Sequence, residues 1–259
     1  MANKKILLIG DNCIDEFIYT KCTRFCPEAP VPVLDIEVIK ENPGMAGNVY
    51  ENLKAFGLGV EFIHNDNYKE VKKSRIVDNA TNHMFLRIDK SDHTDPIDLR
   101  ALIKLDFSNY EAVVISDYCK GFVSEALITL ISKLHPLTFL DTKKVLGEWA
   151  AAITYIKINE SEYKNNVRHG LREELFADNL IVTLGAKGCR YRGEEYNSTS
   201  VDVKDVSGAG DSFLSGLIYK YLETRKIDVS LRFANRVARS AVAERGVSIV
   251  KPNNLLELF

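Results

Sequence analysis

The chain has 259 residues, of which 46% are hydrophobic and 27% are charged, and its formal net charge is −2. This length and composition allow a single domain, residues 1–259, with one sizeable core. Acidic and basic residues are interspersed and no apolar run reaches about 18 residues, so neither a nucleic-acid-binding surface nor a membrane surface or span is expected.

Short apolar runs bounded by turn residues predict buried strands along the chain. The predicted strands are Lys5–Ile9, Val60–Ile63, Ala112–Ser116, Thr138–Asp141, Thr154–Ile158 and Leu180–Leu184. Several are apolar on both faces, as in a parallel sheet covered by helices. The first run is shorter than the apolar region of a signal peptide, and the five cysteines lack metal-ligand spacing. We therefore expect a cytoplasmic protein with reduced thiols.

Helical periodicity appears between and after these strands. The predicted helices are Asn48–Phe56, Ser124–Leu134, Leu171–Ala177, a helix from Phe213 to Leu222, and a helix from Leu231 to Val242 that stops before Gly246. Alternating strands and helices predict the α/β class, with a doubly wound, mostly parallel sheet and helices on both faces.

Two segments depart from this alternation. Val31–Val38 alternates in the manner of a half-exposed strand, and Arg75–Asp89 has a hairpin pattern with a turn at Asp78–Asn82. Together they predict a small β-sheet outside the main layer, formed by segments at about residues 13–40 and 72–90.

The string Asp205-Val206-Ser207-Gly208-Ala209-Gly210-Asp211-Ser212-Phe213-Leu214-Ser215-Gly216 carries the strongest chemical signal. Its glycines precede an amphipathic helix, where the backbone can approach a ligand closely. The free N–H groups of the helix start favour an anion such as a phosphate. Asp211, in the first turn, could take a proton from an incoming hydroxyl, although an N-cap is the structural alternative.

This string resembles the C-terminal signature of the ribokinase-like (PfkB-type) carbohydrate kinases. Three other segments follow the order of that family along nearly the whole chain. Gly10–Asp15 resembles its N-terminal strand with a sugar-binding acid, Pro43–Val49 its glycine-rich sugar-binding turn, and Asn159–Glu162 its Asn-x-x-Glu motif. The resemblance implies a kinase that uses ATP and Mg²⁺, with a small β-sheet that acts as a lid.

Within this family the chain is most similar to the heptose 7-phosphate kinases. Cys26–Val33 resembles their Ser-Pro-Glu-Ala-Pro-Val-Pro-Val string, although a stiff edge strand would also explain its prolines. Lys73–Arg75 with Arg87–Asp89 resembles their lid strands, and Ser116–Gly121 resembles their Ser-Asp-Tyr-x-Lys-Gly string. These matches imply an acceptor that already carries a phosphate.

The chain also departs from the family pattern. Met45 replaces a glycine of the sugar-binding turn, and Asp141-Thr142-Lys143 stands where Asp-Pro-Lys is usual. The chain is shorter than typical members between Ile63 and Lys73, where a helix and a strand are missing. These departures bear on the substrate more than on the reaction.

The resemblance also implies residue roles. Asp211 would be the general base, and Gly208, Ala209 and Gly210 would stabilise the transferred charge. The acceptor would contact Asp11, Asp15, Gly44, Gly47, Asn48, Arg75, Arg87 and Lys120. Capping, turn formation and ordinary surface charge are the structural alternatives for these positions.

For the nucleotide, the resemblance implies contacts from Asn159, Thr183, Gly185, Gly188 and Asn235. Asn159 and Glu162 would hold Mg²⁺ through water, and Asp205 and Ser207 would hold a monovalent cation such as K⁺. A capping box explains Asn159 and Glu162 equally well, and core packing explains Asn235.

Three hypotheses about function stay open on the sequence. The first is a kinase for heptose or hexose phosphates. The second is another family member, such as a fructokinase, ketodeoxygluconate kinase or nucleoside kinase. The third is an inactive sugar-binding or scaffold homologue. A homodimer through exposed edges of the small sheet is a separate hypothesis.

Overall fold

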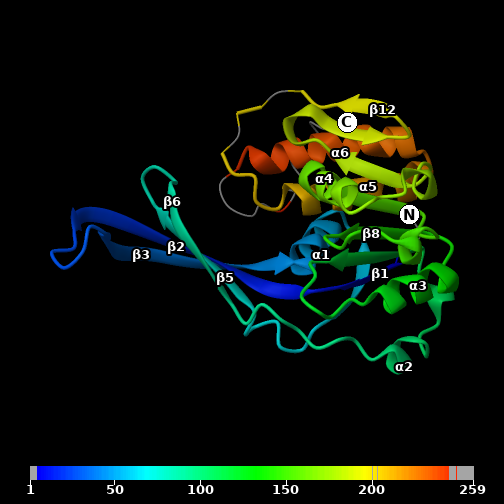
Figure 1. The fold of residues 1–259 in the computed structure, drawn as a ribbon, viewed down its shortest axis with the longest axis horizontal. Coiled ribbons are helices and arrows are strands. Elements are labelled where there is room, and N and C mark those ends of the chain that lie inside the picture. The colour runs from blue at the N-terminus through cyan, green and yellow to red at the C-terminus, as the bar shows by residue number, and fades with distance from the viewer. Residues whose placement is uncertain (1–4, 200, 203, 245–248, 250–259) are drawn as a thin grey trace.

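The computed structural model describes residues 5–199, 201–202, 204–244 and 249. An eight-stranded sheet with helices on both faces forms the body, and a four-stranded sheet projects from it as a long arm (Figure 1). We call these the main sheet and the small sheet. The predicted α/β class and the predicted second sheet are both confirmed.

The main sheet has the strand order β12-β11-β10-β9-β8-β7-β1-β4. Pairing is parallel from β10 to β4 and antiparallel between β10, β11 and β12. All six predicted strands are present, whereas the β11–β12 hairpin was not predicted. The strands are β1 Lys5–Gly10, β4 Gly59–His64, β7 Ala112–Asp117, β8 Thr138–Thr142, β9 Tyr155–Asn159, β10 Leu180–Thr183, β11 Gly188–Tyr191 and β12 Glu194–Asn197.

Two hydrophobic clusters separate the helices into two layers. In β1, Ile6 and Leu8 face one cluster and Leu7 and Ile9 face the other, because successive side chains of a strand alternate. Among the described residues no helix has both the length and the apolar character needed to cross a membrane. The first cluster is covered by α1 Ala46–Ala55, α5 Ala209–Thr224 and α6 Ile227–Val242, and the second by α2 Leu99–Leu102, α3 Glu125–Leu134 and α4 Glu160–Arg168.

Two helix predictions need correction. Leu171–Ala177 is not an α-helix, since it holds only the 3₁₀ turn Glu173–Leu175, which starts without a side-chain cap. Helix α4 was missed because its sequence is mostly polar and gives little hydrophobic periodicity. The predicted stop at Gly246 lies outside the described residues, and α6 itself ends at Val242.

The small sheet has the order β3-β2-β5-β6. Both segments predicted to form it contribute strands, namely β2 Asn12–Phe25, β3 Pro32–Met45, β5 Lys72–Asp78 and β6 Met84–Lys90. Strand β2 follows β1 after the single residue Asp11, and β3 leads directly into α1. The β2–β3 hairpin therefore begins and ends at the body of the molecule.

Candidate functional site

The carboxyl ends of β1, β7, β8 and β9 meet at one edge of the main sheet. The chain passes from β1 to β4 on one side and later to β7 on the other, so the strand order reverses between β1 and β7. In open α/β sheets, ligands bind in the crevice at such a reversal. The small sheet leaves the body at this same edge (Figure 1).

Asp211 lies at the centre of this edge and is 5% exposed. It stands in the first turn of α5, just after Gly208, whose φ of 78° suits glycine because other residues avoid the left-handed region. The Tyr118 hydroxyl donates to Asp211 Oδ1 at 2.6 Å, and Asn48 Nδ2 donates to Oδ2 at 2.8 Å. Asn52 in turn donates to Asn48 Oδ1 at 3.0 Å. The carboxylate is thus fixed by donors from two other elements.

Burial raises the pKa of Asp211 to about 6, although the hydrogen bonds from Tyr118 and Asn48 act in the opposite direction. A carboxyl group that titrates near neutral pH is suited to take a proton and to release it again. The hydroxyl of Tyr118 does not compete for this role, because burial and the nearby Asp211 charge raise its pKa well above the ordinary value.

Two pockets meet at Asp211. The main-sheet pocket has a volume of about 370 Å³ and the small-sheet pocket about 320 Å³. Four residues line both: Tyr118, Lys143, Gly208 and Asp211. A group bound in one pocket can therefore meet a group bound in the other beside the Asp211 carboxylate.

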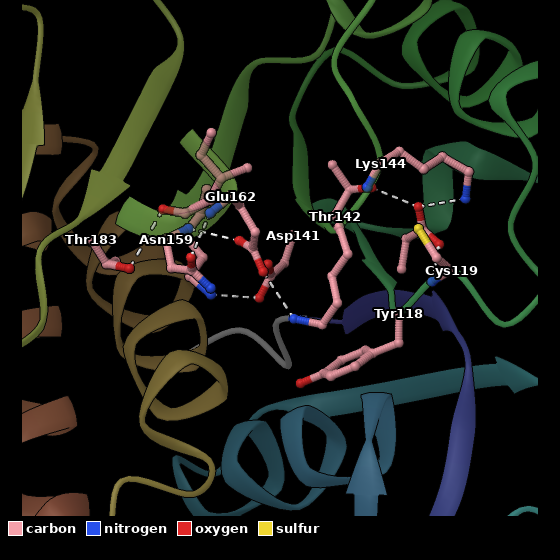
Figure 2. Close-up of polar contacts among 12 residues, drawn as sticks. Tyr118, Cys119, Asp141, Thr142, Lys144, Asn159, Glu162 and Thr183 are labelled. Atoms are coloured by element: carbon pink, nitrogen blue, oxygen red, sulfur yellow. Dashed lines mark hydrogen bonds and ion pairs between the residues drawn. The ribbon is translucent and has the colours of Figure 1, made fainter. Parts of the chain in front are cut away.

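The main-sheet pocket contains most residues predicted to bind the nucleotide or the transferred phosphate. The predicted residues that line it are Asn159, Thr183, Gly185, Gly208, Ala209, Gly210 and Asp211. Two lysines that were not predicted also line it. Lys157 Nζ contacts Asp141 Oδ2 at 2.7 Å, and Lys143 Nζ contacts Glu162 Oε1 at 2.9 Å (Figure 2). These cations place positive charge in the pocket beside the carboxylates of Asp141 and Asp211.

Burial shapes the charges of this pocket. It raises the pKa of Asp141, while Lys157 opposes that shift. For Lys143, burial works against the charged form, but Asp141 and Glu162 together outweigh burial and raise the pKa of the ammonium. Lys143 therefore keeps its positive charge at neutral pH.

Asn159 and Glu162 form the capping box of α4. Asn159 Oδ1 accepts from the Glu162 N–H at 2.8 Å, and Glu162 Oε2 accepts from the Asn159 N–H at 2.7 Å. Since Lys143 occupies the other Glu162 oxygen, direct coordination of a metal would break existing bonds. Contact through water fits better, because oxygen ligands suit Mg²⁺ and this ion keeps part of its hydration shell.

The small-sheet pocket contains five of the residues predicted to bind the acceptor: Asp15, Asn48, Arg75, Arg87 and Lys120. Each of its three predicted cations already has a carboxylate partner. Arg75 pairs with Asp15 at 2.6 Å between Nη1 and Oδ1. Arg87 Nε donates to Asp89 Oδ1 at 2.6 Å, and Lys120 pairs with Asp92.

Asp11 lines neither pocket. It is fully buried, and its carboxylate accepts from the backbone N–H of Tyr118 at 2.7 Å and from that of Phe122 at 3.3 Å. Asp117, also buried, holds the same loop through the Thr142 hydroxyl and Lys144 Nζ, at 2.6 and 2.7 Å (Figure 2). Asp11 thus fixes the loop that carries Tyr118, which differs from the predicted contact with a sugar.

Four residues predicted to contact the acceptor or the nucleotide also do not line the pocket expected for them, and neither does Glu162, which was predicted to hold Mg²⁺. Asn235 Nδ2 donates to the backbone carbonyl of Tyr196 at 2.7 Å, which agrees with its core-packing alternative. Gly188 begins β11 and packs against the same carbonyl. Gly44 packs against the side chain of Asp15, and Gly47 packs against that of Asn12.

Met45, the residue that replaces a family glycine, has a φ of 53° and precedes α1. Few side chains adopt this conformation, which explains why a glycine suits the position. Its side chain is buried against Cys13 and Val71 and also lines the small-sheet pocket. The substitution therefore adds apolar surface where the family pattern leaves space.

Asp205 and Ser207, predicted for a monovalent cation, lie in the loop before α5. The Ser207 N–H donates to Asp205 Oδ1 at 2.8 Å, and Ser207 also lines the small-sheet pocket. In the part of the chain that the structure describes, no group of three or more His, Cys, Asp or Glu residues could hold a metal ion. A cation at this loop would depend on backbone carbonyls.

The pocket residues to which sequence reasoning gave no role include Lys73, Tyr118, Lys143 and Lys157. Three of them lie inside motifs that were recognised, so a closer reading of those motifs could have found them. Lys157 had a separate signal, since a lysine inside the otherwise apolar strand Tyr155–Asn159 needs a buried partner.

Comparisons with known proteins identify the family of this chain. Residues 45–254 match the model of the pfkB family of carbohydrate kinases. The bifunctional protein HldE of a Nitratiruptor species is 31% identical over 94% of this chain, and that of Helicobacter pylori (strain J99) is 30% identical over 95%. The chain covers 62% and 64% of these relatives, so it spans less than two thirds of their length.

Solved structures show the same fold at low sequence identity. Ribokinase from Thermotoga maritima aligns with a TM-score of 0.75 and 16% identity, covering 98% of both chains. Phosphofructokinase-2 from Escherichia coli, in complex with substrates and products, aligns with a TM-score of 0.74 and 16% identity over 98% of both chains. The same enzyme has been solved in complex with potassium, with a TM-score of 0.72 and 16% identity over 98% of this chain and 97% of that one.

Proposed function

Because the chain belongs to the pfkB family of carbohydrate kinases, which are ATP-dependent sugar kinases, we propose that it phosphorylates a sugar that already carries a phosphate, of the heptose 7-phosphate type. One observation carries this proposal. Five cationic side chains line the small-sheet pocket, against the two carboxylates Asp15 and Asp211. The cations are Lys73, Arg75, Arg87, Lys120 and Lys143. A pocket for a neutral sugar has no need of this excess.

In the proposed mechanism, Asp211 is the general base. The acceptor hydroxyl lies at the junction of the two pockets, and the Asp211 carboxylate takes its proton as the hydroxyl oxygen attacks the γ-phosphorus. The bond from phosphorus to the β,γ-bridging oxygen breaks, and ADP leaves. Tyr118 and Asn48 keep the carboxylate aimed at the acceptor throughout, because each donates to one of its oxygens.

The nucleotide binds in the main-sheet pocket in this proposal. The N–H groups from Gly208 to Asp211 and the positive end of α5 stabilise the charge that develops on the transferred phosphoryl group. Lys143 and Lys157 add positive charge beside it. Mg²⁺ would neutralise charge on the phosphates, and Asn159 and Glu162 would hold it through water. Thr183 and Gly185 form the pocket wall at the end of β10.

Several further features belong to the same proposal. The small sheet closes over the acceptor as a lid and excludes water. Asp205 and Ser207 would provide carbonyl ligands for K⁺. Exposed apolar side chains on the outer strands β3 and β6 pair with a second copy and form a homodimer, which light scattering would detect. They are Ile36, Val38, Ile39, Met84, Leu86 and Ile88. A cytoplasmic location supplies the ATP.

The decisive experiment is an ADP-release assay on the purified chain with a panel of sugars and sugar phosphates. We expect kcat/KM for a heptose 7-phosphate to exceed that for the matching free heptose. Better turnover of fructose or a nucleoside would reject the phosphosugar acceptor while leaving the kinase activity intact. A lack of ADP release with every member of the panel would reject the proposed acceptor class.

A second candidate is a family member that acts on a neutral sugar. The observation in its favour is that Arg75, Arg87 and Lys120 are already paired with Asp15, Asp89 and Asp92. These three cations should therefore bind an incoming phosphate more weakly than three unpaired cations would. The two candidates differ in whether the pocket holds a cation that is not neutralised.

A further inference from the structure

The small sheet places two rows of side chains on its pocket face. In the register of the sheet, Lys73 of β5 lies between Asp15 of β2 and Asp89 of β6. Two residues further along, Arg75 lies between Phe17 and Arg87. Because side chains alternate along a strand, both rows point to the same face. Lys73 is therefore flanked by a carboxylate on each neighbouring strand.

Both flanking carboxylates are bound to arginines of the next row. Arg75 Nη1 reaches diagonally to Asp15 Oδ1 at 2.6 Å, and Arg87 Nε reaches along its own strand to Asp89 Oδ1 at 2.6 Å. Within residues 5–199, 201–202, 204–244 and 249, the Lys73 ammonium has no hydrogen bond or ion pair. Its contact is the Tyr118 ring, whose centroid lies 5.3 Å from Nζ.

This unpaired ammonium is buried and lines the pocket. Lys73 is 8% exposed, which is rare for a lysine without a carboxylate partner. Burial lowers its pKa, and the nearby cations Lys120 and Arg87 act in the same direction, while Cys13 and Asp15 oppose them. A cation–π contact compensates only part of the loss of hydration, so the site favours an added anion.

The other cations of the pocket do not offer the same opportunity. A phosphate that binds Arg75, Arg87 or Lys120 must compete with a carboxylate already in contact. A phosphate that binds Lys73 replaces nothing, and its hydrogen bonds are all new. The cation without a carboxylate partner therefore contributes most to binding of the phosphate.

We propose that Lys73 is the anchor for the phosphate of the acceptor, while Arg75 and Arg87 stay bound to Asp15 and Asp89 and hold the pocket in shape. This inference rests on the proposed phosphosugar acceptor and names the residue that selects it. Lys73 then determines specificity, because a sugar without a phosphate leaves its ammonium buried and unpaired.

The test combines a change in the enzyme with a change in the substrate. Lys73→Met keeps the length of the side chain and removes the charge. Its matched control is Lys72→Met, since Lys72 points to the other face and pairs with Glu16 and Glu41. Initial rates are measured with a heptose 7-phosphate and with the matching free heptose. We expect Lys73→Met to raise KM for the phosphosugar about 10- to 100-fold, with kcat and the KM for ATP within threefold.

The kinetics with the free heptose show whether Lys73 binds the phosphate or has a structural role. We expect Lys73→Met not to raise the KM for the free heptose, since the variant removes an ammonium that this sugar leaves unpaired, and we expect Lys72→Met to leave all kinetics unchanged. An equal loss for both acceptors would overturn the proposal, because Lys73 would then act through Tyr118 or through the fold. An unchanged KM for the phosphosugar would overturn it as well.

Two further measurements test the proposal if Lys73→Met folds poorly or if no acceptor turns over. They are a charge-conserving variant and a binding titration. Lys73→Arg should retain most of the preference for the phosphosugar even if Lys73→Met folds poorly, and loss of preference in a folded Lys73→Arg counts against the proposal. If no acceptor turns over, titration calorimetry with heptose 7-phosphate and ADP still applies. Weaker binding by Lys73→Met than by wild type supports the anchor, and equal or absent binding rejects it.

Discussion

The edge of the main sheet and the small sheet differ in how they hold their charges. In the main-sheet pocket both lysines have carboxylate partners, Lys157 with Asp141 and Lys143 with Glu162. In the small-sheet pocket Lys73 has none among the described residues. The lysines of the main-sheet pocket are therefore paired before a ligand binds, whereas Lys73 gains an anionic partner only from a ligand. This difference supports the proposal that the main sheet carries the chemistry and the small sheet selects the acceptor.

Packing supports the same division. Strands β1 and β7 are almost entirely buried between two layers of helices. Strands β3 and β6 are largely exposed, and the cluster at the base of the small sheet has only Cys13, Met45 and Val71 as buried members among the described residues. Regions with few buried apolar contacts open at lower free energy. The small sheet is therefore the part of the molecule suited to move as the acceptor enters.

The largest expected effect belongs to the main sheet. Asp211→Asn removes the proposed base but keeps the shape of the side chain and an oxygen that can accept from Tyr118. We expect kcat to fall by about 10²–10⁴, the usual cost of losing a general base. ATP affinity, measured by calorimetry, should stay within threefold. A kcat within a few-fold of wild type would remove Asp211 from the mechanism.

The same substitution has a consequence for stability. The folded-state pKa of Asp211, about 6, lies above its ordinary value, so the ionised carboxylate disfavours folding above that pH. Stability from this group is therefore present at low pH and is lost as pH rises from about 4 to 6. Asp211→Asn removes this loss but turns an amide N–H toward the donor Nδ2 of Asn48, so its stability relative to wild type should be higher at pH 7.5 than at pH 4.5, with a difference of at most about 3 kcal/mol. Denaturant titration at pH 7.5 and at pH 4.5 checks the sign of this difference.

A smaller effect is expected at the floor of the main-sheet pocket. A Cβ at Gly210 would lie 2.8 Å from Lys157 Nζ, which must then shift away from Asp141. Gly210→Ala should raise the KM for ATP about tenfold, a cost in line with a weakened charge-assisted contact. The KM for the acceptor should change little, because Lys157 lines only the other pocket. A change confined to the acceptor KM would contradict the assignment of the two pockets.

The sequence predicted the main sheet far better than the charges of the site. The apolar strands and the Gly208–Asp211 helix start are local patterns, and local patterns were enough to place them. The row order of the small sheet depends on register between strands far apart in sequence, so no local pattern shows that Arg75 neutralises Asp15. For the same reason the sequence places Lys73 in a recognised motif but does not show that its ammonium lacks a carboxylate partner.

Asp11 and Tyr118 show a second reason why the site could not be predicted from the sequence, which is the order of the strands. A carboxylate at a strand end resembles a ligand contact in sequence, yet Asp11 accepts hydrogen bonds from the loop that follows β7. Tyr118, which lies in that loop, is 107 positions from Asp11 along the chain. Its position beside β1 results from strand order, which hydrophobic periodicity does not specify.

The pH profile offers a finer test at the junction of the two pockets. Tyr118→Phe removes a hydrogen bond that lowers the pKa of Asp211, so that pKa should rise above its present value of about 6. The acid limb of kcat/KM should move to higher pH, with a loss of about three- to tenfold at pH 6 and little loss at pH 8. Tyr191→Phe is the control, because this buried hydroxyl donates to the Asp178 carbonyl at 2.7 Å, away from the site. An acid limb that stays in place would show that Tyr118 does not act on Asp211.

The smallest effect is expected at Arg87, whose side chain is 41% exposed and paired with Asp89. Exposed ion pairs contribute little, so Arg87→Ala should raise KM for a phosphosugar only about two- to fivefold. Part of that rise has an indirect cause, since Asp89 lies in register with Lys73 and becomes free to compete with the phosphate for its ammonium. The double variant Arg87→Ala/Asp89→Ala removes the competitor and should bring KM back toward wild type. A double variant weaker than the single one would mean that Arg87 itself holds the phosphate, and the division between anchoring Lys73 and supporting arginines would have to be reversed.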